Sequence, residues 1–169
     1  MDRYLKLSKF DEVYVFEPNP IFYASYEGSD FKLVKKAIWV EDCKMSFFPS
    51  RDDNQVAGSL LKEKMCKIRS NGVTDFVSNY WHDEIQVECV DFSTWIKDNL
   101  PKGCILTLKL DIEGAEYEVL WKMIKENTIK MVDKLYVEFH SDTLPEKKNF
   151  EYELRVALKD FGIEPLEWD

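Results

Sequence analysis

The stretch CILTLKLDIEGAEYEVLWKMIK, residues 104–125, decides the fold class of this chain. Its first part, residues 104–110, is mostly apolar and has the composition of a β-strand. In residues 113–125 the apolar side chains recur every three or four positions, which predicts a helix with one buried face. A buried strand that leads directly into such a helix is typical of α/β proteins.

The same alternation continues on both sides of this stretch. Strands are predicted over residues 12–16, 31–40, 44–49, 85–90, 134–139 and, at the edge, 163–168. Helices are predicted over residues 21–26, over 150–161 with Gly162 after its end, and through residue 99 from a cap at Asp91 or Ser93. Residues 50–80 are polar and weakly patterned, so we expect a surface excursion there, with a possible helix over 60–68. We therefore predict an α/β fold with a mostly parallel sheet, in a single domain spanning residues 1–169.

Charge and cysteine content indicate the setting in which the chain works. It carries 32 acidic and 23 basic residues, a net charge of −9, and such a surface repels nucleic acid. The four cysteines are widely spread and form no C-x-x-C pair. Residues 1–7 are polar, unlike a signal peptide, and no apolar run is long enough to span a membrane. We expect a cytoplasmic protein without a membrane span.

The glycines exclude two common phosphate-binding loops. There are six, and the closest pair, Gly103 and Gly114, is 11 positions apart. Neither G-x-G-x-x-G nor G-x-x-x-x-G-K-[ST] therefore occurs in this sequence.

Acidic side chains follow three of the predicted strands. Glu17 follows the first strand, Asp111 and Glu113 follow the strand at 104–110, and Glu138 and His140 end the strand at 134–139. In parallel sheets the carboxyl ends of the strands form the ligand site. A carboxylate in the position of Glu17 can accept hydrogen bonds from both hydroxyls of a ribose. The sequence therefore predicts a site at this edge of the sheet.

The last of these groups also bears on metal binding. Glu138, His140 and Asp142 are two residues apart, so they could project from one face of a strand. Glu138 and His140, together with Asp111 and Glu113, could form a general-base site or a weak divalent-cation site. The spacing is not that of a zinc site, and we predict no metal. His82, in the irregular region, is expected to be an ordinary surface histidine.

Three motifs together resemble one enzyme family. VFEPNP (residues 15–20), KLDIEGAE (109–116) and YVEFH (136–140) occur in the order and approximate spacing typical of FkbM-type methyltransferases. The resemblance implies a Rossmann-like class I sheet that transfers a methyl group from S-adenosylmethionine, usually to an oxygen. It implies that Glu17 and Asn19 bind the cofactor, with Glu17 on the ribose hydroxyls, and that Ala37 and Ile38 lie near the adenine.

The resemblance also assigns the remaining site residues. Asp111 and Glu113 would face the methionine part of the cofactor and the acceptor. Glu138 and His140 would lie beside them, with Glu138 binding acceptor. The catalytic base would be Asp111 or His140.

One part of the family pattern has no counterpart in this sequence. FkbM-type chains carry a first strand and an Asp-x-Gly-Ala-Asn-x-Gly loop before the Phe-Glu-Pro motif. That strand lies between the strands that end at Glu17 and Asp111. Three arrangements follow: an upstream segment supplies the strand, another chain supplies it, or the sheet closes directly.

The function implied by the resemblance is S-adenosylmethionine-dependent O-methylation of a small molecule or sugar. The alternative is a non-catalytic remnant of such an enzyme that acts as a binding or partner module. A sugar-nucleotide enzyme, in which Glu17 would still bind a ribose, is a third possibility, against which the absence of a phosphate-binding loop argues.

Overall fold

The stretch from residue 104 to 125 forms the strand and the helix that its pattern predicts. In the computed structural model, which describes residues 10–51, 57–70 and 73–167, these are β8 (Thr107–Leu110) and α2 (Glu116–Lys125). β8 runs parallel to β9 (Lys134–Val137), with Leu108 opposite Leu135. The helix therefore crosses from one end of this sheet toward the other, as a βαβ connection requires.

Parallel and antiparallel pairs both occur among the strands. β1 (Tyr14–Phe16) pairs in parallel with β2 (Lys32–Val34). β7 (Ile85–Asp91) lies between β3 (Ala37–Trp39), to which it is parallel, and β4 (Cys43–Phe47), to which it is antiparallel. β5 (Cys66–Ser70) and β6 (Val73–Val77) form an antiparallel pair. The fold is a mixed α/β fold, as predicted.

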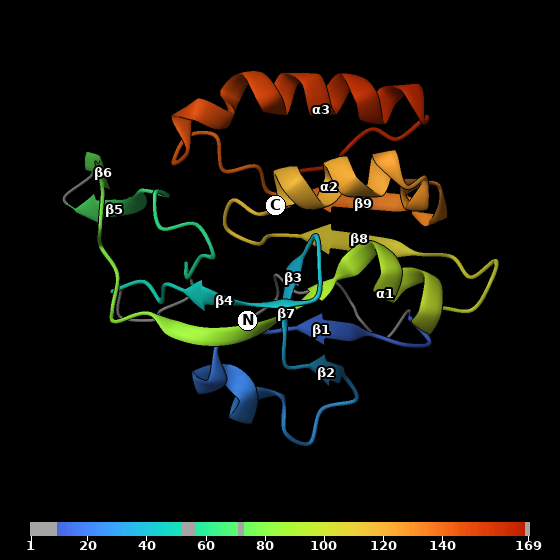
Figure 1. The fold of residues 1–169 in the computed structure, drawn as a ribbon, viewed down its shortest axis with the longest axis horizontal. Helices are drawn as coiled ribbons and strands as arrows, with labels where there is room; N and C mark the ends of the chain where they lie inside the picture. The colour runs from blue at the N-terminus through green and yellow to red at the C-terminus, as the bar shows by residue number, and fades with distance from the viewer. Residues whose placement is uncertain (1–9, 52–56, 71–72, 168–169) are drawn as a thin grey trace.

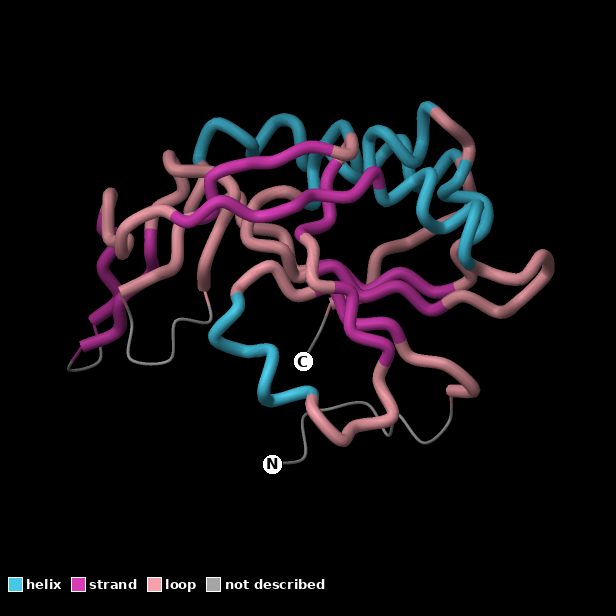
Figure 2. The backbone as a smooth tube through the Cα atoms, turned by 60° about the horizontal axis from the view of Figure 1, so that its bottom comes forward, coloured by secondary structure: helices cyan, strands magenta, loops and turns pink. Residues whose placement is uncertain are grey.

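The helices cover the β8–β9 end of the molecule. α3 (Lys148–Asp160) lies beside α2, and α1 (Phe92–Asn99) follows β7 directly (Figure 1). Short 3-10 helices occur at Pro20–Tyr26, Thr128–Met131 and Pro145–Lys147. Figure 2 shows the α-helices gathered on one side of the strands and Pro20–Tyr26 on the other.

The main hydrophobic core joins these helices to β8 and β9. The inner face of α2 contributes Tyr117, Leu120 and Met123, all without solvent contact, and Leu110 of β8 and Leu154 of α3 pack with them. On the side of β1, the Phe16 ring packs edge-on against the rings of Phe92 and Trp95 in α1. The apolar spacing in residues 113–125 thus predicted the buried face of α2 correctly.

In the described part of the chain, β1 and β8 each have a neighbouring strand on one side only. Within the described ranges, β1 is hydrogen-bonded to β2 alone and β8 to β9 alone, and the two do not pair with each other. The sheet therefore does not close directly across the position of the family's first strand. The opening residues, 1–9, lie outside the described ranges.

The single strand predicted over residues 31–40 is wrong, because the chain forms two strands there. β2 ends at Val34 and β3 begins at Ala37, and between them Lys36 donates its backbone N–H to the carbonyl of Val34 at 2.8 Å. The two strands pair with different partners, β1 and β7. The apolar character of residues 31–40 does not show where one strand ends and the next begins, because that point is set by the change of pairing strand from β1 to β7.

The helix considered for residues 60–68 is also wrong. The chain turns at Lys64, whose N–H donates to the carbonyl of Leu61, and then enters β5 at Cys66. Met65 donates its N–H to the carbonyl of Thr143 at 3.0 Å, and Cys66 is buried with Phe48 and Trp81. These contacts are remote in sequence, and they override a weak helical spacing.

The helix predicted from residue 113 begins three residues later, at Glu116. Glu113 has φ of 56° and Gly114 has φ of 106°, and neither value is compatible with a right-handed helix. A Cβ at Gly114 would lie 2.5 Å from Cδ1 of Leu144, so any other residue there would force the Leu144 side chain or the turn to move.

The ends of the other predicted helices agree well with the structure. Asp91 caps α1 by accepting a hydrogen bond from the N–H of Thr94 at 3.1 Å, and Gly162 follows α3 with φ of 75°. The final edge strand predicted for 163–168 is reduced to one parallel bridge between Leu166 and Tyr136. None of the helices in the described ranges has the length and apolar character needed to cross a bilayer.

Candidate functional site

The carboxyl ends of β1 and β8 border one cavity of about 120 Å³. Six of the eight residues predicted to form the site line its wall: Glu17, Asn19, Ala37, Ile38, Asp111 and Glu113. The other two, Glu138 and His140, do not. A larger hollow of about 290 Å³ lies at the amino end of β9 and is lined by none of the predicted residues. We therefore centre the candidate site on the smaller cavity.

Glu17 directly follows β1 and is held by the turn after it. Its Oε1 accepts a hydrogen bond from the backbone N–H of Asn19 at 2.7 Å. Burial raises the pKa of Glu17, and this hydrogen bond offsets the rise only in part. No cationic side chain of the described residues forms an ion pair with it. The carboxylate is thus desolvated without a positive partner, and it faces a cavity that a hydrogen-bond donor could enter.

Asn19 begins the 3-10 helix after this turn. Its Oδ1 accepts a hydrogen bond from the N–H of Ile21 at 3.3 Å and so caps the helix. The residue is 2% exposed, and its Nδ2 is buried without a hydrogen-bond partner among the residues that the structure describes. The side chain therefore uses its acceptor in the fold and leaves its donor unused.

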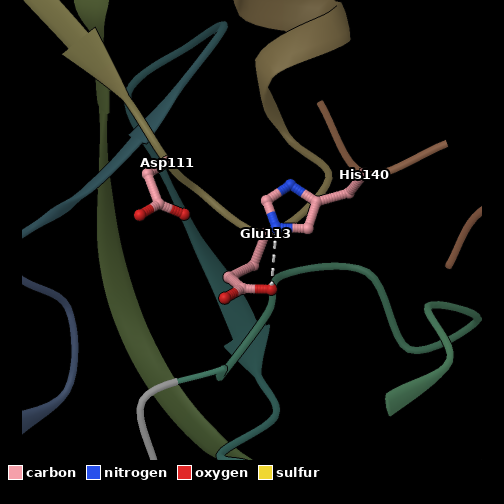
Figure 3. A group of neighbouring side chains, drawn as sticks. All are labelled: Asp111, Glu113 and His140. Carbon is pink, nitrogen blue, oxygen red and sulfur yellow. Dashed lines mark ion pairs between the residues drawn. The ribbon is translucent and has the colours of Figure 1, made fainter. Parts of the chain in front are cut away.

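Glu113 lies on the far wall of the cavity, in a left-handed backbone conformation. Its Oε2 is 2.6 Å from Nζ of Lys64, which is 3% exposed, and 3.2 Å from Nε2 of His140 (Figure 3). Burial alone would raise the pKa of Glu113, but His140 and Lys64 outweigh it and lower the pKa below its usual value. Glu113 is therefore ionised and neutralised by two buried cations.

His140 has a carboxylate at each ring nitrogen. Nδ1 lies 3.1 Å from Oε1 of Glu116, which is fully buried and also accepts the backbone N–H groups of His140 and Gly114. Burial lowers the pKa of His140, but the hydrogen bonds to Glu113 and Glu116 outweigh burial and raise the pKa to about 10. The imidazole is therefore a cation at neutral pH.

Asp111 lies next to this charged group but has a different environment. Its side chain is 31% exposed, and Oδ2 is 3.1 Å from Nζ of Lys109. Figure 3 shows it beside Glu113 and His140, and one ligand atom from each of the three lies within 4.8 Å of the others. The distances suit a divalent cation, but His140 would have to lose a proton in order to coordinate one. The charges of Lys64 and His140 already balance those of Glu113 and Glu116.

Glu138, His140 and Asp142 follow β9 and do not belong to it. β9 ends at Val137, and the chain then turns. Burial raises the pKa of Glu138, and the nearby charge of Asp111 raises it further. Asp142 instead pairs with Lys67 at 2.6 Å. The strand assumed in the prediction that Glu138, His140 and Asp142 project together therefore ends before all three. The charge of His140 nevertheless acts to lower the pKa of Glu138 and that of Asp142.

A comparison with models of protein families assigns the chain to a family. Residues 4–164 match the family model of the methyltransferase FkbM domain. The chain belongs to the FkbM methyltransferase family. Comparisons with curated proteins and with solved structures found no match. The resemblance drawn from the three motifs is thus confirmed, and the cavity lies where two of these FkbM motifs meet.

Three members of this FkbM site were not predicted from the sequence. Lys64 neutralises Glu113, Glu116 holds His140, and Ser59 donates its hydroxyl to the carbonyl of Glu113 at 2.7 Å. The place of Glu116 in the first turn of α2 is that of an ordinary helix-capping carboxylate, so its position in the sequence does not indicate a contact with His140. Lys64 and Ser59 lie in the irregular region, where no local pattern indicated that they would be buried. His82 is exposed, as expected.

Proposed function

We propose that this FkbM methyltransferase uses S-adenosylmethionine to methylate an oxygen of a small molecule or sugar. The observation that carries the proposal is the cavity, whose wall brings together Glu17, Asn19, Ala37, Ile38 and the two carboxylates that follow β8. These residues come from three separate segments of the chain. Their convergence on one cavity is what a ligand site requires.

The residues of the cavity suit the cofactor chemically. S-adenosylmethionine supplies a methyl group bound to a positively charged sulfur. Among the described residues, Glu17 has no cationic partner and Nδ2 of Asn19 has no acceptor, so the two could hold the ribose. Ala37 and Ile38, both buried, provide an apolar wall for the adenine. The cavity, at about 120 Å³, is smaller than the roughly 300–1,000 Å³ of most ligand pockets, so we assign it to the ribose and its neighbours.

We assign the role of general base to Asp111. A base must be unprotonated before the reaction, and His140 is held as a cation between Glu113 and Glu116. Asp111 is partly exposed and so can be reached by an acceptor hydroxyl. In this proposal His140 positions Glu113, and Glu138 binds acceptor beside Asp111.

Calorimetric titration with S-adenosylmethionine and S-adenosylhomocysteine tests the proposal. We expect binding to the wild-type chain, and Glu17→Ala should weaken it by roughly 1.5–3 kcal/mol, the value of a charge-assisted hydrogen bond. Glu88→Ala, which removes an exposed partner of Lys44 outside the cavity, should bind as the wild type does. No heat and no thermal shift at millimolar ligand would refute an enzyme that uses this cofactor.

A second candidate function, that of a partner module, rests on the open edges of β1 and β8. Each belongs to a parallel pair of only two strands in the described part of the chain, and such small parallel sheets are rare and marginally stable. A strand from another polypeptide, inserted between them, would join the pairs into one Rossmann-like sheet. This would also add a loop at the carboxyl end of the inserted strand, beside the cavity.

A further inference from the structure

Two cysteines lie opposite each other in the antiparallel pair of β4 and β7. The register of the two strands places Cys43 directly across from Cys89, and both are free thiols. Directly opposite residues of antiparallel strands have Cα atoms about 4.5–5.5 Å apart, and a disulfide spans about 4.4–6.8 Å. The backbone therefore holds the two cysteines at the separation that a disulfide requires.

Contacts on the other face of the two strands fix this register. Nζ of Lys44 lies 3.1 Å from Oε1 of Glu88, and these two residues are the next opposite pair along the strands. Further on, Nε2 of Gln86 donates to Oγ of Ser46 at 2.9 Å, and these residues are also opposite each other. Side chains alternate between the faces of a strand, so both cysteines share the face turned away from these polar pairs.

The two thiols differ in accessibility and in acidity. Cys43 is partly exposed, whereas Cys89 is 1% exposed. Burial raises the pKa of Cys89, and the Cys43 side chain raises it further, through its charge and a hydrogen bond between the two side chains, to about 12. The Cys89 thiol therefore stays protonated at neutral pH, within hydrogen-bonding reach of Cys43. Cys43 is the thiol that an oxidant meets first.

We propose that Cys43 and Cys89 are a redox modification site, at which a peroxide converts the two thiols into a disulfide that alters the adjoining wall of the cavity. The Cys43 sulfur attacks one peroxide oxygen, the O–O bond breaks, and a sulfenic acid and one water form. This uncharged group no longer opposes loss of the Cys89 proton. The Cys89 sulfur then attacks the sulfenic sulfur, the S–O bond breaks, and the hydroxyl leaves with the Cys89 proton as a second water.

The cysteine pair lies behind one wall of the cavity. On the other side of β7, Cys89 is opposite Ala37 of β3, and Ala37 lines the cavity. Phe47, at the end of β4, also lines the cavity and shares one buried apolar cluster with Ala37 and Cys89. Closing the disulfide draws the two sulfur atoms together, and closely packed neighbours shift with them. The oxidation state of the pair is therefore coupled to the shape of the cavity.

Mass spectrometry of the peroxide-treated chain tests the disulfide. After treatment with hydrogen peroxide, alkylation of the remaining thiols and proteolysis, we expect one cross-linked pair of peptides, containing Cys43 and Cys89, which dithiothreitol separates. Cys89→Ala should leave Cys43 as a sulfenic acid that dimedone traps. Cys104→Ala, which removes the other partly exposed cysteine of the described residues, is the matched control and should form the same cross-link as the wild type. Wild-type thiols that stay unmodified, or a cross-link through Cys66 or Cys104, would contradict the proposal.

Ligand binding tests the effect on the cavity, and this part rests on the proposed function. We expect the oxidised wild type to bind S-adenosylhomocysteine about fivefold or more weakly than the reduced chain, with dithiothreitol restoring the affinity. Cys43→Ala should bind equally well before and after peroxide treatment. Equal affinity of the reduced and the cross-linked wild type would overturn the coupling to the cavity. Failure of both forms to bind would overturn the proposed function and the coupling with it, but not the disulfide, which is detected without a ligand.

Discussion

The protonation of His140 is decided by what surrounds it. As a residue at the end of a strand it could have been a base, but Glu113 and Glu116 hold both ring nitrogens. Lys64 supplies the second positive charge, so two buried carboxylates face two buried cations. The group is neutral as a whole, which reduces the cost of burying its charges.

This group makes stability depend on pH in a defined direction. The pKa of His140 is raised from 6.5 to about 10 in the folded chain, so the folded state binds the proton more tightly. The contribution of the protonated His140 to the free energy of unfolding is complete below about pH 6.5 and is lost as the pH rises toward about 10. Glu113 acts in the opposite pH range because its pKa is lowered in the folded chain. Its contribution to the free energy of unfolding is complete above pH 4.5, the pKa in the unfolded chain, and is lost as the pH falls through the lower pKa of the folded chain.

We expect the free energy of unfolding to fall between pH 7 and 9 by up to about 1 kcal/mol per pH unit in the wild type. His140→Gln should show a smaller slope, because it has no proton to lose at this position. Urea unfolding at pH 6, 7, 8 and 9 measures both slopes. His82→Gln, which leaves the buried group unchanged, is the control. Equal slopes in the wild type and in His140→Gln would contradict the charged state of His140.

At the scale of elements, the turn between β8 and α2 positions the site. Asp111 and Glu113 reach the cavity because the chain does not enter the helix until Glu116. The positive φ values of Glu113 and Gly114 create this delay. The sequence predicted both the strand and the helix but placed the start of the helix too early. The spacing of apolar residues does not show that Glu113 and Gly114 have positive φ values.

Gly114→Ala should therefore destabilise the chain more than an ordinary glycine substitution. Forcing an alanine into the left-handed region costs about 1–2 kcal/mol, and the contact with Leu144 adds about 1–3 kcal/mol. Gly103→Ala is the matched control, since Gly103 also has a positive φ of 77° but a Cβ there meets nothing within 4 Å. Chemical denaturation compares the two variants. If the free energy of unfolding of Gly114→Ala were no lower than that of Gly103→Ala, the turn between β8 and α2 could accommodate a side chain, and the prediction would be wrong.

At the scale of the whole molecule, the open edges of β1 and β8 raise the question of what lies between them. The backbone N–H of Glu17 donates to the carbonyl of Val34, and the N–H of Lys32 donates to the carbonyl of Val13. The odd-numbered residues in β1 and directly beside it therefore point their backbone groups toward β2. In a parallel ladder the intervening residues then point their backbone groups to the other side. The amides of Tyr14 and Phe16 therefore lie on the open edge.

Hydrogen exchange distinguishes an open edge from a covered one. In the purified chain we expect the amide of Phe16 to exchange at least about tenfold faster than that of Glu17, whose donor is paired. A partner that inserts a strand would slow the exchange of Tyr14 and Phe16 without changing Glu17. Equal protection of Phe16 and Glu17 in the purified chain would mean that the edge is already covered.

The sequence by itself determined the alternation of strands and helices outside residues 31–40 and 50–80, the buried face of α2, a cap for α1 at Asp91 or Ser93, and the family. It also determined that Glu17, Asp111 and Glu113 meet at one cavity, because the carboxyl ends of parallel strands converge. These features depend on local periodicity, on capping chemistry and on short motifs, all of which can be read along the chain.

The tertiary structure alone decided the break between β2 and β3, the burial of Lys64, the contact of Glu116 with His140 and the burial of the Asn19 amide away from any acceptor in the described part of the chain. Each depends on groups far apart in the sequence, such as Lys64 and Glu113. Hydrogen-bond partners and desolvation follow from proximity in space, and no local pattern of residues contains that information.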